Sequence, residues 1–252
     1  MPIEQVLMPK EKWLDFWKYF KEEQAQVAGV ELLYDQIKKS NPTLLANNAS
    51  WAELYREQGT VHAALDTPEW PISKQQMGEI MLCSPDSLPD SLMDDYARCC
   101  ETFHLDRINQ AYFLGQCGHE SCGLRYPVEI HDGSNYEFRN DLGNSQPGDG
   151  VKFAGTGWIQ VTGRYNHQSF ADYLATQGKS DPKVMAEGKT YTSEVYPWSI
   201  SGHWWHVNGM VDYCKRKPDV DRVGERVNGR YLPNGYEDRR AFTARAFRVL
   251  GE

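Results

Sequence analysis

The chain has 252 residues and a mass of 28.9 kDa, with 40% hydrophobic, 25% charged and 12% aromatic residues. A chain of this length and composition can build a hydrophobic core, which excludes the disordered and collagen-like classes. The net charge is −8 and the Lys and Arg residues are scattered, which disfavours nucleic acid as the main partner. No apolar run approaches the roughly 18 residues of a membrane span, so we expect a soluble protein without stable membrane insertion.

The first 20 residues carry charges where a secretory signal would have its apolar segment. We therefore expect the chain to stay in the cytoplasm of the cell that makes it. Six cysteines are too few for a disulfide scaffold, and the adjacent Cys99 and Cys100 are poor partners for each other. Free thiols in a reducing compartment are expected.

The N-terminal part of the chain is predicted to be a separate helical region. Apolar residues recur at helical spacing over about residues 10–39, and Asn41-Pro42 ends that stretch because the residue before a proline is disfavoured in the α conformation. A second short helix is expected at about 50–57, followed by a linker at 58–72 that contains Gly59, Pro68 and Pro71. We therefore place one helical region at residues 1–72 and a larger domain at 73–252.

The larger domain is predicted to be mostly α. Helices are expected at about 72–82, 87–103, 107–122, 165–177, 194–208, 219–227 and 237–250. Asp106 can cap the start of the third helix, and Gly123 can stop it. Residues 131–158 are rich in Gly, Asn and Asp and are predicted to form one long polar loop, which in a compact domain is usually functional.

Two glutamates stand next to this loop. Glu120 closes the apolar helix at 107–122, and Glu129 follows nine residues later. On a continuous helix nine residues rotate by about 900°, which would leave the two side chains on opposite faces. Gly123 and Pro127 can break the helix, so that the chain folds back and both carboxylates face one cleft. Two such carboxylates are the groups that hydrolyse glycosidic bonds, although a glutamate pair at this spacing is by itself more often two solvated charges.

An ordered series of motifs surrounds these glutamates. Its members are Gly118–Ser121, Tyr136–Asn144, Gln146–Gly150, Phe153–Arg164, Val227–Gly229 and Asp238–Phe242. The series resembles glycoside hydrolase family 19, and most closely its bacterial and phage branch of chitinases and peptidoglycan-cleaving endolysins. The resemblance covers about residues 85–251 and leaves residues 1–72 outside.

The resemblance implies a lysozyme-like domain that hydrolyses its substrate with inversion. Glu120 would be the general acid that protonates the glycosidic oxygen, and Glu129 the general base that activates a water. An inverting pair is separated by about 6.5–9.5 Å to leave room for that water. Thr162 falls where the family keeps a hydroxyl that helps to hold the water.

The resemblance also implies four substrate-binding residues, Gln160, Asn166, Asn228 and Arg239. We expect Tyr136 to bind the substrate as well, and we expect no metal and no cofactor. Partial burial at the apolar helix end would favour the protonated carboxyl that an acid needs at Glu120, whereas Glu129, beside a polar loop, can stay ionised. Tyr126, Tyr136 and Trp158 could offer flat faces to sugar rings, although each is singly more often a packing residue.

The sequence departs from the family pattern at two positions. Gly155-Thr156-Gly157 stands where the family usually has Gly-Arg-Gly, which removes a cation that could contact an anionic glycan. Phe138 stands where glycine is common. Both departures concern substrate preference more than the two glutamates.

Other candidate sites receive less support. Cys117, His119, Cys122 and the nearby His131 fit no usual zinc spacing, and no H-E-x-x-H motif occurs. We expect His119 to orient Glu120 or the loop. A cysteine peptidase built on Cys117 would need a particular histidine and an orienting partner, which nothing singles out. The tryptophans at 198, 204 and 205 are expected in the core more than on a binding surface.

The predicted function is endolysin-type cleavage of the peptidoglycan sugar backbone for host cell lysis. The expected partners are peptidoglycan glycan strands or chitin oligomers, and a monomer is expected. The enzyme would accumulate in the cytoplasm of the infected cell and act on the wall after release. The alternatives are a chitinase acting on β-1,4-linked N-acetylglucosamine and a non-catalytic glycan-binding virion protein. Residues 1–72 could be a wall-binding or assembly module.

Overall fold

The computed structural model describes residues 72–229 and 235–251. Contacts between Cα atoms divide the chain into residues 1–67 and 68–252, and the described residues lie in the second unit. The helices expected at 10–39 and 50–57 and the linker at 58–71 lie outside the described residues. The boundary at 72/73 stays a prediction.

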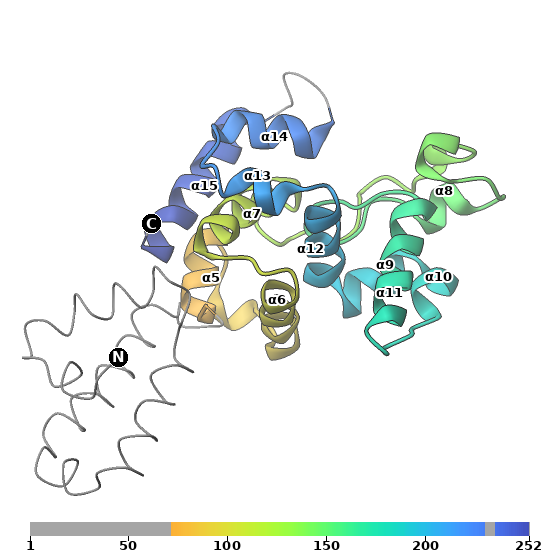
Figure 1. The fold of residues 1–252 in the computed structure, drawn as a ribbon, viewed down its shortest axis with the longest axis horizontal. Coiled ribbons are helices and arrows are strands. Elements are labelled where there is room, and N and C mark those ends of the chain that lie inside the picture. The colour runs from red at the N-terminus through yellow and green to blue at the C-terminus, as the bar shows by residue number, and fades with distance from the viewer. Residues whose placement is uncertain (1–71, 230–234, 252) are drawn as a thin grey trace, which may run out of the picture. The chain divides into compact units, whose positions relative to one another are not determined.

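The described chain is a set of helices joined by turns and one long irregular stretch (Figure 1). The α-helices are α5 (Lys74–Met81), α6 (Asp90–Thr102), α7 (Arg107–Glu120), α8 (Asp149–Lys152), α9 (Arg164–Thr176), α10 (Lys183–Glu187), α11 (Lys189–Val195), α12 (Pro197–Val207), α13 (Met210–Cys214), α14 (Val220–Asn228) and α15 (Tyr236–Leu250). Three 3₁₀ turns are η2 (Pro85–Ser87), η3 (Ser134–Tyr136) and η4 (Asn140–Leu142). No strand is assigned over these residues, so the mostly α, lysozyme-like class expected from the sequence is confirmed.

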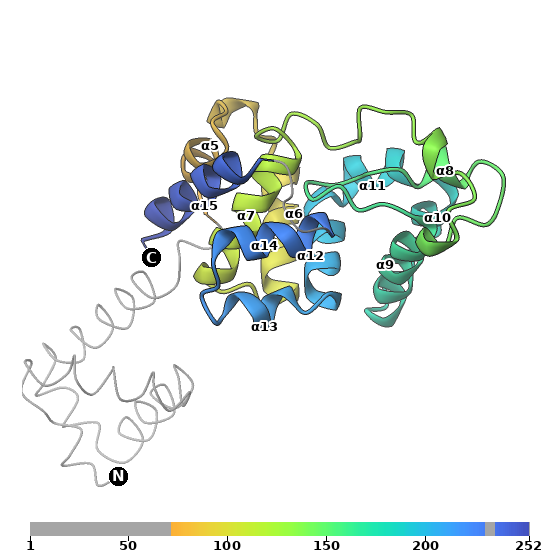
Figure 2. The same ribbon diagram turned by 90° about the horizontal axis from the view of Figure 1, so that it is seen from above.

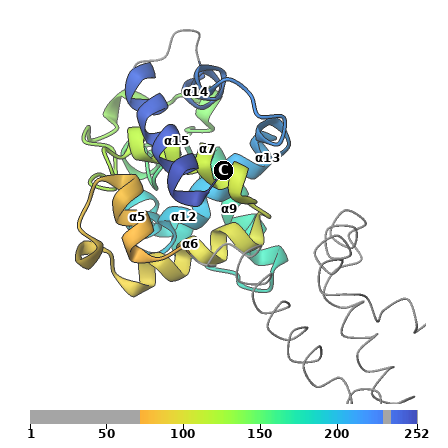
Figure 3. The same ribbon diagram turned by 90° about the vertical axis from the view of Figure 1, so that its left-hand side faces the viewer.

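Helix α7 lies at the centre of one end of this unit. It packs against α5, α13, α14 and α15, and Figure 3 shows these helices around it. Asp106 caps its first turn by accepting a hydrogen bond of 2.8 Å from the backbone N–H of Asn109, as the sequence predicts. Residues 109–118 are all buried, so α7 is a core helix and not an amphipathic surface helix.

Two glycines let α15 approach α7 closely. A Cβ added at Gly115 would lie 2.0 Å from Oγ1 of Thr243, and one added at Gly118 would lie 2.4 Å from the ring of Phe242. Any larger residue at either position would therefore push the two helices apart. This close packing fixes α15 and its polar residues against the C-terminal end of α7.

Helix α12 connects the two ends of the unit. Figures 1 and 2 show α8 to α11 gathered at the end away from α15, with α12 between. The N-terminus of α12 is held by the buried Asp95, which accepts the backbone N–H groups of Trp198 (2.7 Å) and Ser199 (3.1 Å). Ser201 of α12 in turn accepts the backbone N–H of Trp158 at 2.9 Å. One helix therefore positions the segment in which the Phe153–Arg164 motif lies.

The core is rich in aromatic side chains. Trp198 and Trp205 are fully buried and pack edge-on or tilted against Tyr96, Phe113 and Trp158. Core positions for these two tryptophans are confirmed. Trp158 is itself 4% exposed, so its ring is a packing residue and offers no open face to a sugar.

The predicted helices are present, with two kinds of difference. The helix expected at 194–208 is divided at Tyr196 into α11 and α12, because Pro197 begins a new helix at its first position. The short helices α8, α10 and α13 were not expected. The stretch at 131–158 is irregular as predicted, but it contains η3, η4 and α8.

All six cysteines have free thiols, and four of them are buried: Cys99, Cys100, Cys117 and Cys214. Burial raises the pKa of the Cys117 thiol well above its ordinary value, which disfavours a nucleophilic thiolate there. No three metal-binding side chains converge in the part of the chain that the structure describes. Over the same residues, no helix has the length and apolarity to cross a membrane.

Two buried histidines predict that the fold is sensitive to acid. Burial lowers the pKa of His167 and of His203 to about 4, whereas an imidazole in the unfolded chain takes up a proton below about pH 6.5. Because the unfolded chain binds these protons first, stability falls as pH decreases from about 6.5 to about 4, by up to about 3 kcal/mol for each histidine. Urea unfolding at pH 7 and pH 4.5 measures this loss.

The matched variant is His203→Phe, since Phe103, Phe170 and Tyr173 surround this ring. The variant should lose part of the stability difference between the two pH values. An unchanged difference would mean that other groups cause the acid sensitivity.

Candidate active site

Glu120 is the last residue of α7 and is paired with a buried arginine. Its Oε1 accepts a hydrogen bond of 2.5 Å from Nη2 of Arg239 on α15. The Arg239 side chain is 1% exposed and that of Glu120 is 19% exposed. Glu120 therefore contacts a positive charge that is almost fully buried.

The same guanidinium holds a third side chain. Nη1 of Arg239 donates to Oε1 of the fully buried Gln116 at 2.5 Å. Gln116 precedes Glu120 by one helical turn, so both side chains lie on one face of α7. Gly224 of α14 makes room for the arginine, because a Cβ there would lie 2.9 Å from its Cδ.

The chain reverses direction directly after Glu120. The carbonyl of Ser121 accepts the backbone N–H groups of both Arg125 and Tyr126, and its hydroxyl accepts the N–H of Leu124. Gly123 has a φ of +70°, which favours glycine, and its N–H donates to the carbonyl of Gly118. The helix therefore ends two residues before the predicted position, and the chain folds back as expected.

Glu129 is held by two neutral donors. Its Oε1 accepts the hydroxyl of Tyr136 at 2.9 Å, and its Oε2 accepts the backbone N–H of Gly155 at 3.1 Å. Its own N–H donates to the carbonyl of Gly155 at 2.9 Å. Isolated antiparallel bridges continue this pairing from Val128 to Thr156 and from Thr156 to Val161. The two carboxyls are thus held by different groups, and their predicted separation of about 6.5–9.5 Å stays a prediction.

A chain of polar side chains extends from Glu129 along the motif segment. Gln160 donates from Nε2 to the carbonyl of Tyr126 at 3.1 Å, and a Cβ added at Gly155 would lie 2.6 Å from its Oε1. The hydroxyl of Thr162 donates to the carbonyl of Gln160, and Nδ2 of Asn166 donates to the carbonyl of Thr162. Gln160 therefore lies beside Glu129 at Gly155, whereas Thr162 and Asn166 follow Gln160 through hydrogen bonds that are local in sequence. Gln160 has a φ of +58°, a strained backbone of the kind found at functional sites.

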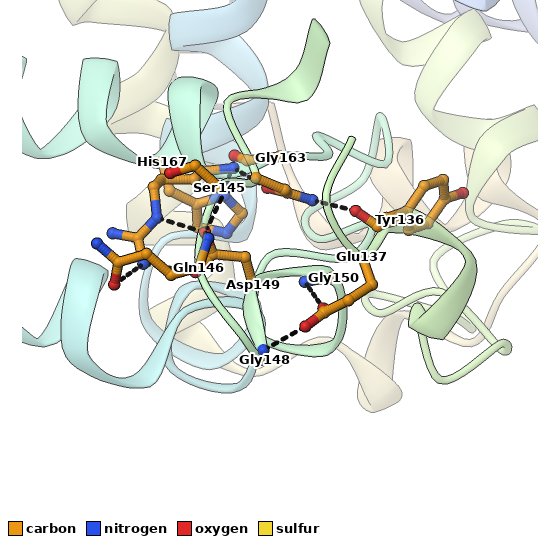
Figure 4. A network of polar contacts seen from close by, with 11 residues as sticks. Tyr136, Glu137, Ser145, Gln146, Gly148, Asp149, Gly150, Gly163 and His167 are labelled. Carbon is orange, nitrogen blue, oxygen red and sulfur yellow. Dashed lines mark hydrogen bonds and ion pairs between the residues drawn. The ribbon is translucent and has the colours of Figure 1, made fainter. Parts of the chain in front are cut away.

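The loop that carries Tyr136 (Figure 4) is fixed by hydrogen bonds of the Asn144 side chain. Nδ2 of Asn144 donates to the carbonyl of Tyr136 at 2.9 Å, and its Oδ1 accepts the backbone N–H of Arg164 at 2.8 Å. Burial raises the pKa of Tyr136 to about 12, with a further contribution from the hydrogen bond to Glu129. The phenol therefore stays a hydrogen-bond donor at neutral pH.

Two carboxylates close the rest of this loop (Figure 4). Glu137 accepts the backbone N–H groups of Gly148 (2.5 Å) and Gly150 (2.7 Å). The buried Asp149 accepts two hydrogen bonds from the Arg164 guanidinium, of 2.8 and 2.5 Å, and this pairing holds its pKa below the ordinary value. The residues that carry the family resemblance here are mainly supports of the loop.

The other predicted residues, His119, Asn228 and Tyr126, have no recorded contact with either glutamate carboxyl. His119 contacts Asp238 of α15 through Nδ1 at 2.8 Å, and the ring lies against Gly235. It thus holds the beginning of α15 rather than contacting Glu120 through a recorded hydrogen bond. Asn228 is exposed at the end of α14, and no described residue is recorded as its side-chain partner. Tyr126 is 45% exposed, so its ring is open to solvent.

The two departures from the family pattern have physical explanations. Thr156 is fully buried, and its hydroxyl is bonded to the Thr192 hydroxyl at 3.0 Å and to the carbonyl of Lys189, so this side chain faces α11 and offers nothing to an anionic glycan. Phe138 has a φ of +56°, in the region that favours glycine, and its side chain is 58% exposed.

The sequence analysis gave no role to Gln116, Gly155 or Asn144. Each of them lies in or beside a quoted motif, and the signal for Gln116 was its spacing of four residues before Glu120 on a helix. Gly155 and Asn144 could be noticed only because they lie within the sequence motifs. Their hydrogen-bond partners are between 8 and 26 residues away in the sequence.

Replacing Phe138 with glycine tests the strain at this position. Phe138→Gly should stabilise the protein by about 0.5 kcal/mol, because the cost of the left-handed backbone exceeds the entropy that glycine adds to the unfolded chain. Val151→Gly is the control, since Val151 is exposed but helical and its replacement by glycine should destabilise the protein by about 0.5 kcal/mol. Thermal unfolding measures both, and a loss in the first variant would show that the Phe138 ring makes stabilising contacts.

Comparison with known proteins gives both a sequence relative and a shared fold. No family model matches the chain. A glycosyl hydrolase family 19 domain-containing protein of Haemophilus influenzae is 26% identical over an alignment of 166 residues. The match covers 54% of this chain and 76% of the relative. The structure of chitinase C from Streptomyces griseus matches with a TM-score of 0.54 at 16% identity, over 72% of this chain and 93% of the chitinase.

A second solved structure, a bacterial family 19 chitinase described as differing from the plant enzymes, has a TM-score of 0.51 at 18% identity. The match covers 71% of this chain and 95% of that one. At these identities the solved structures establish the fold, and the sequence relative supports the resemblance from the sequence side. The resemblance to glycoside hydrolase family 19 is therefore confirmed, as is the expectation of a glycoside hydrolase.

Proposed function

We propose that this glycoside hydrolase cleaves the glycan backbone of bacterial peptidoglycan by a single displacement with inversion. The observation that carries the catalytic part is the contrast between its two carboxyls. Glu120 accepts a hydrogen bond from the buried Arg239 guanidinium on one of its carboxylate oxygens, whereas the Glu129 carboxylate accepts hydrogen bonds from two neutral donors. The peptidoglycan part rests on the motif series, which resembles the branch that includes phage endolysins.

In this proposal Glu120 is the acid. Arg239 binds its Oε1, so the proton that is transferred to the glycosidic oxygen is carried on Oε2. As the bond breaks, the carboxyl becomes a carboxylate next to the guanidinium. Arg239 therefore stabilises the charge that develops during the reaction.

Glu129 is the base in the same step. Tyr136 and the N–H of Gly155 fix the orientation of its carboxylate without adding a charge that would weaken it as a base. Thr162 donates its hydroxyl hydrogen to the carbonyl of Gln160, which leaves its oxygen able to accept a hydrogen bond from the attacking water. The water then attacks the sugar on the face opposite the leaving oxygen.

A chitinase is the second candidate, because both solved structures with this fold described above are chitinases. Chitin and peptidoglycan share β-1,4-linked N-acetylglucosamine, so one catalytic pair could act on either. We further propose that the protein works as a monomer. It would be released from the cytoplasm of the infected cell, reach the cell wall and cause lysis by degrading it.

The test compares wild type with Glu120→Gln and Glu129→Gln on purified Gram-negative sacculi and on soluble chitin oligomers. Each variant keeps the side-chain shape but removes a group that transfers a proton, which should lower the rate by about 10²–10⁴-fold. Wild type should clear sacculi, leave chitin oligomers largely intact and release products whose first-formed anomer is α. Cleavage of the oligomers in place of sacculi would make the protein a chitinase, and binding without cleavage would support a glycan-binding protein.

The support of the base is tested by Tyr136→Phe. Removing the hydroxyl takes one of two hydrogen bonds from the Glu129 carboxylate, and the rate should fall about tenfold because a hydrogen bond to a charged group is worth about 1.5–3 kcal/mol. Tyr165→Phe is the control, since this tyrosine is 71% exposed. Equal rates for both variants, measured on the substrate that wild type cleaves, would show that Tyr136 does not orient the base.

A further inference from the structure

The third member of the Glu120–Arg239 group is a side chain without an assigned role. Gln116 is fully buried, and its Oε1 accepts Nη1 of Arg239 at 2.5 Å. Arginine has only donors, so the carbonyl oxygen of the amide, and not its nitrogen, must face the guanidinium. The orientation of the Gln116 amide is therefore fixed by Arg239.

This orientation has a cost. Nε2 of Gln116 is buried and has no hydrogen-bond partner among the described residues. A buried amide nitrogen without a partner destabilises the fold.

The geometry of arginine shows what the contact can do. A guanidinium prefers to pair with a carboxylate through two parallel hydrogen bonds, one to each oxygen. Here Nη1 is engaged by Gln116 while Nη2 donates to Oε1 of Glu120. A bidentate pair through Nη1 and Nη2 would use both carboxylate oxygens of Glu120 as acceptors. Such a pair would oppose protonation of the Glu120 carboxylate.

We propose that Gln116 is a positioning residue: by engaging Nη1 of Arg239 it limits the arginine to one oxygen of Glu120 and leaves the other oxygen for the transferable proton. This inference rests on the proposed role of Glu120 as the acid. Gln116 itself does not touch the substrate and acts only through the guanidinium.

Other charged and titratable groups around this pair come from three helices. Cys117 lies one turn before Glu120 on α7, and its thiol interacts with that carboxyl. His119 is paired with Asp238 of α15. Glu225 of the adjoining α14 is held by Arg222 and Tyr236. The variants below leave all of these groups unchanged.

Two substitutions at residue 116 should act in opposite directions on the pH profile. Gln116→Met removes the acceptor of Nη1, so the arginine can pair with both oxygens of Glu120. The kcat should fall about tenfold or more with KM nearly unchanged, and the alkaline limb of kcat should move to lower pH. Gln116→Glu keeps an acceptor for Nη1 and adds a second carboxylate to share one cation, so the alkaline limb should move up by about one pH unit.

Gln110→Met is the matched control. Gln110 is also buried in α7, and its replacement by methionine removes the hydrogen bonds with the Tyr96 hydroxyl and the Leu105 carbonyl. It should lower the melting temperature as Gln116→Met does, but leave kcat per folded molecule and the pH profile as in wild type. Thermal unfolding corrects each rate for the folded fraction.

The measurements use the full chain and whichever of sacculi or chitin oligomers wild type cleaves. Wild-type kcat and pH profiles in both Gln116 variants, with Glu120→Gln inactive, would overturn the role of Gln116 and leave the proposed function intact. Full activity of Glu120→Gln, or cleavage of neither polymer by wild type, would overturn both. Opposite shifts of the alkaline limb in the two Gln116 variants would support the inference.

Discussion

The site depends on the close approach of α15 to α7. Gly115 and Gly118 allow Thr243 and Phe242 to pack directly on the backbone of α7, and that contact sets the position of α15 along the helix. Because Arg239 lies one turn before Phe242, the same contact brings a buried cation to the end of α7. The proposed acid, Glu120, is therefore positioned by core packing between two helices that are distant in sequence.

The proposed base, Glu129, is positioned by a different kind of support. Glu129 lies on an irregular segment, where no helix can hold it, and its place is set by backbone pairing with Gly155 and by the hydroxyl of Tyr136. Tyr136 depends in turn on a loop closed by the side chains of Asn144, Glu137 and Asp149. Irregular backbone has no repeating hydrogen bonds, so side chains must satisfy its polar groups. This explains why so many polar residues of the motif series do not need to touch a substrate.

The sequence was informative where local rules decide the structure. Asp106 as a cap and the break after Glu120 could be predicted, because capping and chain reversal depend on neighbouring residues. Helices of five residues, such as α10 and α13, are too short to show a periodic pattern. Arg239 and Glu120 are 119 residues apart in the sequence. The periodic pattern of residues does not show which side chains at such a separation come into contact. The family resemblance could assign Arg239 to the site, but not its buried contact with Gln116.

The two supports also explain how neighbouring glutamates can have opposite roles. A base should be ionised before the reaction, and neutral donors on Glu129 favour that form without neutralising it. An acid should be ionised afterwards, and a cation beside Glu120 favours the product of proton transfer. The proposed mechanism also needs a protonated Glu120 carboxyl before the proton is transferred, and a cation paired with both carboxylate oxygens would oppose that form. A guanidinium shared with a neutral amide can stabilise the carboxylate that forms and still leave one oxygen for the proton that must first be bound.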